Sequence, residues 1–390
     1  MLKVLYIADS LNPTWGAYKA IVSLLENIVP KGVQALAITS TFDSQQHIFN
    51  NANIKTQRIL YYSSIYPRCS TIKDKLLFIP RLLRKLLINN IATIKLLIIT
   101  KKYKPDIIHT NVSLTAIGYY VARILKIPHI WHIREYGAID FNTSYYYPSF
   151  SIQKKRYKSK FSYTIGITKD ILKYNKLQNH PNSKIIYDGV LPSHIQSYNP
   201  NKKPYFLYAG RLEKIKGILP LIDAYAEYCT LHLSPLTLYV AGCGSEAYTQ
   251  LVKEKIATCG LENNIKLLGV RNDILELYKD AKAFIVPSLS EGFGFITAEA
   301  MFSGCLVIGN NTAGTKEQFD NGKEITGEEI ALRYTTQEQL VQHLIDVTNN
   351  NTDYYEPMIL RAQQVVTQLY STESHAENVY NFYKEILANQ

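Results

Sequence analysis

The chain contains few cysteines, and none lie in a spacing typical of disulfide frameworks or structural zinc sites. Its 390 residues include five cysteines and no Cys-x-x-Cys pair. We therefore expect a cytoplasmic protein stabilised by apolar cores rather than by covalent links or structural metals. The opening run from Met1 to Ala8 is followed at once by Asp9, which indicates a strand rather than a signal peptide. At this length we expect two domains.

Acidic residues are scarce in the first half of the chain. Before Tyr205 there are 29 Lys and Arg against 9 Asp and Glu, whereas from Tyr205 onward there are 14 against 23. This asymmetry indicates an anionic partner for the first half, and both a nucleic acid and a membrane surface fit that description. No nucleic-acid-binding motif is present, so we expect an anionic membrane surface and no nucleic acid.

The basic segment from Lys55 to Lys104 lacks the long apolar run of a transmembrane helix. It holds twelve Lys and Arg, with Asp74 as its one acidic residue, and these charges interrupt the aliphatic stretch from Leu76 to Ile99. We interpret that stretch as one or two amphipathic helices. Two interpretations stay open, a helix lying in a membrane interface and a solvated helix packed on the domain core. The basic group at Lys154–Lys160 extends the same surface.

Two carboxylates eight positions apart, Glu291 and Glu299, mark a candidate ligand site. An apolar run over 281–286 predicts a buried strand before Glu291, and a helix ending at Gly304 follows. The first amides of that helix, at Phe295 and Ile296, have no partner within the helix and form an anion site. Carboxylates beside an anion site suit a ligand that carries both phosphate and sugar hydroxyls.

A second cluster carries the positive charge that such a ligand requires. The predicted strand at 205–209 is followed by Gly210, Arg211, Lys216 and Gly217, and then by a helical pattern. A guanidinium fork and an ammonium group can neutralise a diphosphate without a metal ion. The sequence also lacks an Asp-x-Asp metal motif, so we expect no metal requirement.

In order and spacing, these two motifs resemble those of the retaining glycosyltransferases of family 4. The resemblance is strongest over about residues 205 to 320. It implies the α/β GT-B fold, in which two Rossmann-like doubly wound domains face a central cleft. The expected parts are an acceptor-binding domain at 1–192, a linker at 193–204, a nucleotide-sugar-binding domain at 205–371 and a helix at 372–390 that crosses back to the first domain.

The resemblance also implies roles for individual residues. Arg211 and Lys216 are expected to bind the donor diphosphate, Glu299 the ribose, and Glu291 the transferred sugar. The catalytic set implied by the family is His132, Glu291, Arg211 and Lys216. The other expected donor-binding residues are Gly16, Val270 and Arg271 beside the base, Gly292, Phe293, Gly294, Phe295 and Ile296.

In the first half, two loops correspond to functional positions of the family. The loop from Asp9 to Gly16 follows the first strand, and only Gly16 of the family's Gly-Gly pair is present, with Ala17 in the second place. His132 lies near the carboxyl end of a predicted strand, at the position where the family has a histidine that faces the donor sugar. Arg134 and Glu135 are candidates for acceptor binding, or they pair with each other.

Alternating patterns predict a parallel sheet covered by helices in the first half. The expected strands are 3–8, 33–39, 106–110, 128–133, 163–168 and 184–187, with helices near 17–29, 91–103, 113–125 and 169–176.

We expect a retaining, metal-independent hexosyltransferase that uses a UDP-sugar or GDP-sugar and needs no cofactor. Its expected acceptor is a lipid-linked saccharide in bacterial cell-surface polysaccharide synthesis. The basic surface of the first half would hold the enzyme at the inner face of the plasma membrane, where such an acceptor lies. The alternatives are a nucleotide-sugar isomerase or epimerase of the same fold and a non-catalytic scaffold or binding subunit.

Overall fold

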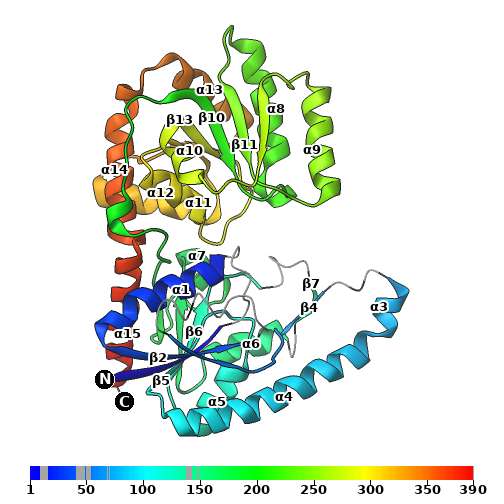
Figure 1. Ribbon diagram of the computed structural model, residues 1–390, viewed down its shortest axis with the longest axis vertical. Coiled ribbons are helices and arrows are strands. Elements are labelled where there is room, and N and C mark those ends of the chain that lie inside the picture. The colour runs from blue at the N-terminus through cyan, green and yellow to red at the C-terminus, as the bar shows by residue number, and fades with distance from the viewer. Residues whose placement is uncertain are drawn as a thin grey trace. The chain divides into compact units, whose positions relative to one another are not determined.

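The chain forms two compact units, each built on a parallel sheet (Figure 1). The computed structural model describes residues 1–8, 16–40, 49, 54–67, 69, 71–137, 143–146 and 149–389. Unit 1 comprises Met1–Gly189 and Thr372–Gln390, and unit 2 comprises Val190–Ser371. Within the described residues, no helix is both long enough and apolar enough to span a bilayer.

Unit 1 contains a seven-stranded parallel sheet in the order β3-β2-β1-β5-β6-β8-β9. The strands are β1 (Leu2–Ile7), β2 (Val33–Thr39), β3 (Lys55–Arg58), β5 (Ile107–Thr110), β6 (His129–Ile133), β8 (Ser162–Gly166) and β9 (Ser183–Ile185). A separate antiparallel pair joins β4 (Ile65–Pro67) to β7 (Thr143–Tyr146).

Helices pack on both faces of the unit 1 sheet, as buried parallel strands require. On one face, α1 (Gly16–Ile28) and the C-terminal helix α15 (Thr372–Ala388) enclose a core that includes Leu24 and Phe382. On the other face, α4 (Phe78–Tyr103) and α5 (Ile117–Leu125) enclose a second core. The remaining helical segments are α3 (Ile72–Leu76), α6 (Phe150–Tyr157), α7 (Lys169–Tyr174) and the short η1 (Val29–Lys31).

Unit 2 contains a six-stranded parallel sheet in the order β12-β11-β10-β13-β14-β15. Its strands are β10 (Lys203–Ala209), β11 (Thr237–Ala241), β12 (Ile265–Gly269), β13 (Ala281–Val286), β14 (Val307–Asn310) and β15 (Leu332–Tyr334). Its helices are α8 (Ile218–Leu231), α9 (Glu246–Thr258), α10 (Ile274–Asp280), α11 (Phe295–Phe302), α12 (Ala313–Thr326), α13 (Gln337–Asn349) and α14 (Thr352–Tyr370), with the short η2 (Ser193–Ile195) and η3 (Lys214–Lys216).

The six strands predicted for the first half are all present, with ends shifted by at most two residues. The predictions omitted β3, β4, β7 and α6, whose short or mixed-polarity sequences carry weak periodic signals. The helix expected near 91–103 is the second half of α4, which begins at Phe78. The amphipathic stretch beginning at Leu76 is thus mostly one helix, preceded by the short α3.

Residues 193–204, expected to form a linker, pack within unit 2. The backbone amide of Ser197 donates to the carbonyl of Phe302 at 3.2 Å. The side-chain amide of Gln196 donates to the carbonyl of Gln363 at 3.0 Å. The chain therefore passes from unit 1 to unit 2 between Gly189 and Val190, and it returns between Ser371 and Thr372.

Candidate functional site

The strand order of unit 2 reverses at its centre, between the neighbouring strands β10 and β13. In doubly wound sheets, ligands bind at such a switch point, outside the carboxyl ends of the strands. The loop after β10 carries Arg211 and Lys216, and the loop after β13 carries Glu291. The topology therefore places both predicted clusters on either side of one switch point.

Lys216 and Glu291 form an ion pair across these two loops. The Lys216 Nζ atom lies 2.6 Å from Glu291 Oε1, although 75 positions separate the two residues in the sequence. Both side chains are mostly buried, with exposed fractions of 17% and 10%. The Ser288 hydroxyl donates to the same carboxylate oxygen at 2.8 Å. Glu291 is thus held in place by an ammonium group and a hydroxyl.

A close backbone approach fixes the distance between the two loops. Gly217 has a φ of +71°, and a Cβ added there would lie 1.9 Å from the carbonyl oxygen of Pro287. The amide of Leu289 donates to the carbonyl of Ile215 at 2.9 Å. Glycine is required at 217 for both its conformation and its missing side chain, and this contact brings Lys216 within reach of Glu291.

The loop after β13 ends at the amino terminus of α11. Gly294 precedes the helix with a φ of +92°, and Gln318 donates to the carbonyls of Phe293 and Gly294 at 2.7 and 3.0 Å. Among the described residues, no acceptor receives a hydrogen bond from the half-buried amides of Phe295 and Ile296. Unpaired amides at a helix start are suited to bind an anion, and the anion site at this loop stays a prediction.

Two buried hydroxyls beside Gly294 add hydrogen-bonding capacity that the sequence did not reveal. The Oγ1 atoms of Thr297 and Thr315 lie 3.3 and 3.7 Å from the position of a Cβ on Gly294. Neither hydroxyl has a partner in the described part of the chain. Buried polar groups are normally paired, so a ligand group in this place would satisfy them. Thr315 was not predictable because it lies on α12, in a segment without a recognisable motif.

Arg211 and Arg271 are not part of the Lys216–Glu291 pair. The Arg211 side chain is 69% exposed and donates to Glu213 at 2.9 Å. Arg271, on the loop after the edge strand β12, donates to both carboxylate oxygens of Asp273, at 2.8 and 2.5 Å. Val270 beside it is 70% exposed. The half-buried Glu299 lies one helical turn after Phe295 on α11.

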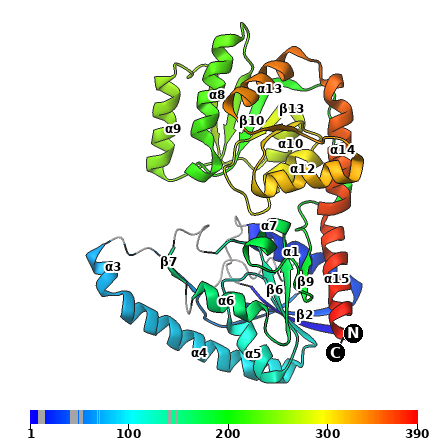
Figure 2. The same ribbon diagram turned by 180° about the vertical axis from the view of Figure 1, so that it is seen from behind.

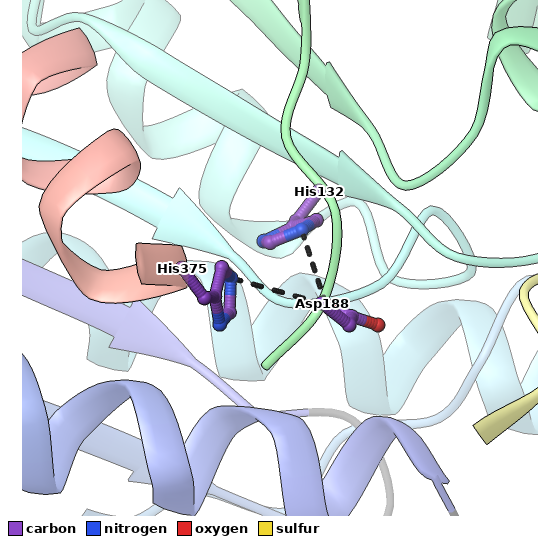
Figure 3. Close-up of side chains that lie close together, drawn as sticks. All are labelled: His132, Asp188 and His375. Carbon is purple, nitrogen blue, oxygen red and sulfur yellow. Dashed lines mark ion pairs between the residues drawn. The ribbon is translucent and has the colours of Figure 1, made fainter. Parts of the chain in front are cut away.

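In unit 1, His132 lies inside the domain rather than at its surface (Figure 3). Its Nδ1 atom is 3.2 Å from His109 Nε2 and 3.1 Å from Arg134 Nη2. Its Nε2 atom lies 3.8 Å from Asp188 Oδ1, and His375 Nε2 approaches the same oxygen at 3.8 Å. Asp188 and His375, which complete this cluster, were not among the predicted site residues.

The side chains of Arg134 and Glu135 bind partners inside unit 1, and the Glu135 carboxylate also accepts from the backbone amide of Arg134 at 3.1 Å. The Arg134 guanidinium donates to Asp188 and, at 3.2 Å, to the side-chain oxygen of Asn111. The Glu135 carboxylate accepts from the amide and hydroxyl of Ser113 at 2.6 and 2.5 Å. Both residues are 8% exposed. Together they fix the segments that follow β5, β6 and β9.

The ligating atoms of His132, Asp188 and His375 all lie within 4.8 Å of one another, close enough to bind a metal ion. Burial lowers the pKa of His132 well below its usual value and that of His375 to about 3, so both rings are neutral at pH 7. Burial also lowers the pKa of Arg134 to about 9, which leaves it charged. The Arg134 guanidinium already binds Asp188. The cluster is therefore best described as an internal Arg134–Asp188 ion pair with a neutral histidine on each side of the carboxylate.

The predicted glycine loop is described only from Gly16 onward, at the start of α1; Asp9–Trp15 lie outside the described residues. The side chain of Asn111 donates to the carbonyl of Ala17 at 2.9 Å. Asn111 also accepts from Arg134, so a single residue links the first turn of α1 to the Arg134–Asp188 pair.

Two doubly wound units, built on parallel sheets of seven and six strands, define the GT-B glycosyltransferase fold. Residues 192–365 match the family model described as glycosyl transferases group 1. Most of unit 2 thus matches this family of glycosyltransferases, and the predicted resemblance and fold class are confirmed.

Individual relatives agree with this assignment. An uncharacterized glycosyltransferase of Methanocaldococcus jannaschii is 24% identical over 72% of this chain and 75% of its own. The UDP-Gal:alpha-D-GlcNAc-diphosphoundecaprenol alpha-1,3-galactosyltransferase of Escherichia coli is 27% identical over 62% of this chain and 69% of its own. The crystal structure of Anabaena HepE in complex with UDP superposes with a TM-score of 0.77 at 18% identity, covering 98% of this chain and 100% of that one.

Proposed function

We propose that the protein is a retaining glycosyltransferase that moves a hexose from a nucleotide diphosphate sugar to a saccharide hydroxyl. The observation that carries this proposal is the Lys216–Glu291 pair at the switch point of unit 2, next to the unpaired amides of α11. The loops after β10 and β13 thus present a cation, a carboxylate and unpaired amides close together. A sugar diphosphate has groups complementary to all three.

In the proposed complex, the donor diphosphate binds at the start of α11. The amides of Phe295 and Ile296 and the ammonium of Lys216 stabilise the negative charge that grows on the leaving diphosphate. The exposed Arg211 exchanges its contact with Glu213 for a phosphate oxygen, because a solvent-exposed ion pair costs little to break. These cations replace a metal ion, and no further cofactor is needed.

Carboxylates hold the two ends of the donor. Glu291 accepts hydrogen bonds from the hydroxyls of the transferred hexose, and Glu299 accepts them from the ribose. The base lies beside Val270 and Arg271, where the exposed loop after β12 offers backbone groups and an apolar side chain. Gly292, Phe293 and Gly294 shape the backbone that surrounds the phosphates.

The proposed reaction requires no nucleophile from the protein. The bond between the anomeric carbon and the diphosphate oxygen breaks, and a bond from that carbon to the acceptor oxygen forms on the same face. The acceptor proton passes to the departing diphosphate oxygen. The nucleoside diphosphate therefore serves as the leaving group and as the base, and the protein supplies orientation and electrostatic stabilisation.

His132, Arg134 and Glu135 are buried, so in this proposal they position other residues of unit 1 rather than touch the substrates. His132, with no exposed surface, acts through Arg134, which it contacts at 3.1 Å. Arg134 and Glu135 in turn hold the segments around Asn111 and Ser113 that support the first turn of α1. Gly16 begins this turn and permits a close approach of ligand to backbone.

We infer a lipid-linked saccharide as the acceptor, in bacterial cell-surface polysaccharide synthesis. The E. coli relative is named for a diphosphoundecaprenol acceptor, and its similarity to this chain extends over most of both chains. The excess of basic residues before Tyr205 suits an acceptor that carries a diphosphate and lies at a membrane.

This function is tested by measuring donor hydrolysis and sugar transfer in the parent protein and in two variants, Lys216→Met and Glu291→Gln. We expect UDP-hexoses or GDP-hexoses to raise the thermal unfolding temperature, since a bound ligand stabilises the folded state. Lys216→Met and Glu291→Gln are each expected to lower kcat by about 10²- to 10³-fold, the usual effect of removing one preorganised charge-stabilising group. A chelator such as EDTA should leave the rate unchanged.

Lys214→Met is the matched control, because Lys214 is an exposed lysine of the same short helix η3. It should retain the activity of the parent protein. Full transfer by folded Lys216→Met and Glu291→Gln variants would contradict the proposed donor site. Interconversion of nucleotide sugars without an acceptor would instead indicate an isomerase.

A further inference from the structure

Helix α4 exposes a row of large aliphatic side chains to solvent. Six of them have exposed fractions between 44% and 64%, and we call these six residues the aliphatic stripe: Ile79, Leu83, Leu87, Ile91, Ile94 and Ile98. In the preceding helix α3, Ile72 and Leu76 are 79% and 74% exposed. Clustered exposed apolar side chains are uncommon on soluble monomers and mark surfaces that bind a partner.

The stripe occupies one face of α4. Its members recur every three or four residues, which places them within about 120° of the helix circumference. The buried residues of α4 are Ala92, Leu96 and Thr100, which lie on the opposite side and in the second half of the helix. The stripe therefore does not contribute to the core of unit 1.

The first half of α4 contacts the segment at residues 62–66 but adds nothing to the buried core. Lys85 donates to the carbonyl of Ile65 at 2.8 Å, and Asn89 donates to that of Tyr62 at 3.0 Å. None of the α4 residues from 78 to 91 is buried, although most of them are apolar. Figures 1 and 2 show α4 running along one side of unit 1, with α3 at its outer end. An aliphatic helix of this kind exposes apolar surface at a free-energy cost unless another phase or molecule covers it.

Cations follow one edge of the stripe. Arg84, Lys95 and Lys102 are exposed and are spaced by nearly whole numbers of helical turns, so they form a row beside it. None of the three has an ion-pair partner among the described residues. Helix α4 contains six Lys and Arg in all and no acidic residue. The exposed side of the helix is thus both apolar and cationic.

We propose that α3 and α4 lie in the interface of a membrane containing anionic lipids. The stripe would enter the boundary between headgroups and acyl chains, and the row of cations would contact lipid phosphates, the arrangement typical of interfacial amphipathic helices. This inference goes beyond the proposed glycosyl transfer and does not depend on it. Of the two interpretations of the segment that sequence periodicity left open, it assigns the membrane interface to the exposed face of α4, while Ala92 and Leu96 pack on the core.

A second copy of the chain is a poorer occupant of this surface. Packing two stripes against each other would bring the cationic rows of both helices close together. No acidic residue of α4 is present to compensate for them, so charge repulsion would oppose the dimer. An anionic lipid surface is complementary to both the stripe and the row.

Vesicle sedimentation with the full-length protein tests the proposal. The parent should bind vesicles of three parts phosphatidylcholine to one part phosphatidylglycerol, and bind pure phosphatidylcholine much more weakly. Leu83→Gln combined with Leu87→Gln should lower binding at least tenfold, because two apolar side chains leave the interface. Arg84→Gln combined with Lys95→Gln should lower it by about 25-fold, since each charge near an anionic surface contributes about fivefold.

A matched control removes two exposed leucines from unit 2. Leu231 and Leu233 are 63% and 104% exposed, and Leu231→Gln combined with Leu233→Gln should leave vesicle binding unchanged. Circular dichroism and thermal unfolding establish that each variant is folded. Undiminished binding by the stripe variants overturns the proposal, and so does equal binding to both vesicle types. A dimer in solution that the stripe substitutions dissociate would also overturn it, by assigning the surface to a second copy.

Discussion

Buried histidines make the stability of unit 1 depend on pH. His129 on β6 is only 1% exposed, and its Nε2 atom lies 2.7 Å from the Thr110 hydroxyl. Its Nδ1 atom has no partner among the described residues. Burial lowers the pKa of His129 from 6.5 to about 3, since the charged ring would lose its hydration.

Because the folded-state pKa of His129 lies below the unfolded value, only the unfolded chain binds the proton between pH 6.5 and about 3. Stability should therefore fall as the pH is lowered through this range, by about 1.4 kcal/mol per pH unit for this one histidine. His129→Gln should reduce that slope, as measured by urea unfolding at a series of pH values with Trp131 fluorescence as the probe of unit 1.

The exposed His194 provides a control for that measurement. Its ring contacts water in the folded and unfolded states, so the stability curve of His194→Gln should follow that of the parent. An unchanged slope in His129→Gln would show that this histidine gains its proton without unfolding. The other buried histidines, His109, His132 and His375, would keep the slope of the variant above zero.

At the scale of single elements, the contact between the loops after β10 and β13 gives a direct test of the site. Gly217→Ala would place a Cβ 1.9 Å from the Pro287 carbonyl oxygen, so the two loops must separate. We expect a loss of donor affinity together with a stability loss of several kcal/mol, the sum of the left-handed backbone cost of about 1 kcal/mol and the steric shift. Urea unfolding and UDP titration measure the two effects.

Gly260→Ala separates the backbone cost from the steric cost. Gly260 has a similar φ of +67°, but a Cβ there would meet nothing within 4 Å. This variant should lose about 1 kcal/mol of stability and bind donor normally. If both alanine variants behave alike, the close approach at Pro287 does not position the donor loops.

Sequence periodicity identified the elements of this fold where one side of an element is buried. The central strands of unit 1, which are buried on both faces, were predicted because they contain continuously apolar runs such as Ala35–Ile38. Helix α4 was predicted as one or two amphipathic helices over Leu76–Ile99, but periodicity alone did not distinguish its core face from its exposed face.

The residues of the predicted site also differ in whether the sequence could identify them. Lys216 and Glu291 were identifiable because each follows a strand whose carboxyl end lies at the same edge of a sheet. The burial of His132 and its contacts with Asp188 and His375 were not, because these depend on packing between segments far apart in the chain. Spacing alone identifies residues near one another along the chain, whereas such clusters need the tertiary structure.

At the scale of the whole molecule, the C-terminal helix α15 is part of unit 1. Five of its residues have side chains in the core beside α1: Ala376, Val379, Phe382, Tyr383 and Ile386. Their burial contributes about 10 kcal/mol. That amount is comparable with the whole stability of a typical domain, about 5 to 15 kcal/mol.

A chain that ends at Ser371 should therefore have an unfolded unit 1 and a folded unit 2. Both tryptophans of the protein, Trp15 and Trp131, belong to the first 189 residues, so tryptophan fluorescence reports on unit 1 alone. Binding of UDP reports on unit 2. A chain ending at Ala388 is the control, and native fluorescence from the shorter chain would refute the assignment of α15 to the unit 1 core.

The return of the chain to unit 1 also determines the order in which the protein can fold during synthesis. Unit 2 is one continuous segment, Val190–Ser371, and can fold as soon as it leaves the ribosome. Unit 1 begins first but is completed last, because translation of the intervening segment takes about 10 to 40 s at ordinary elongation rates. Throughout that interval the apolar side of α1 lacks its cover, which makes the nascent first domain a natural client for chaperones.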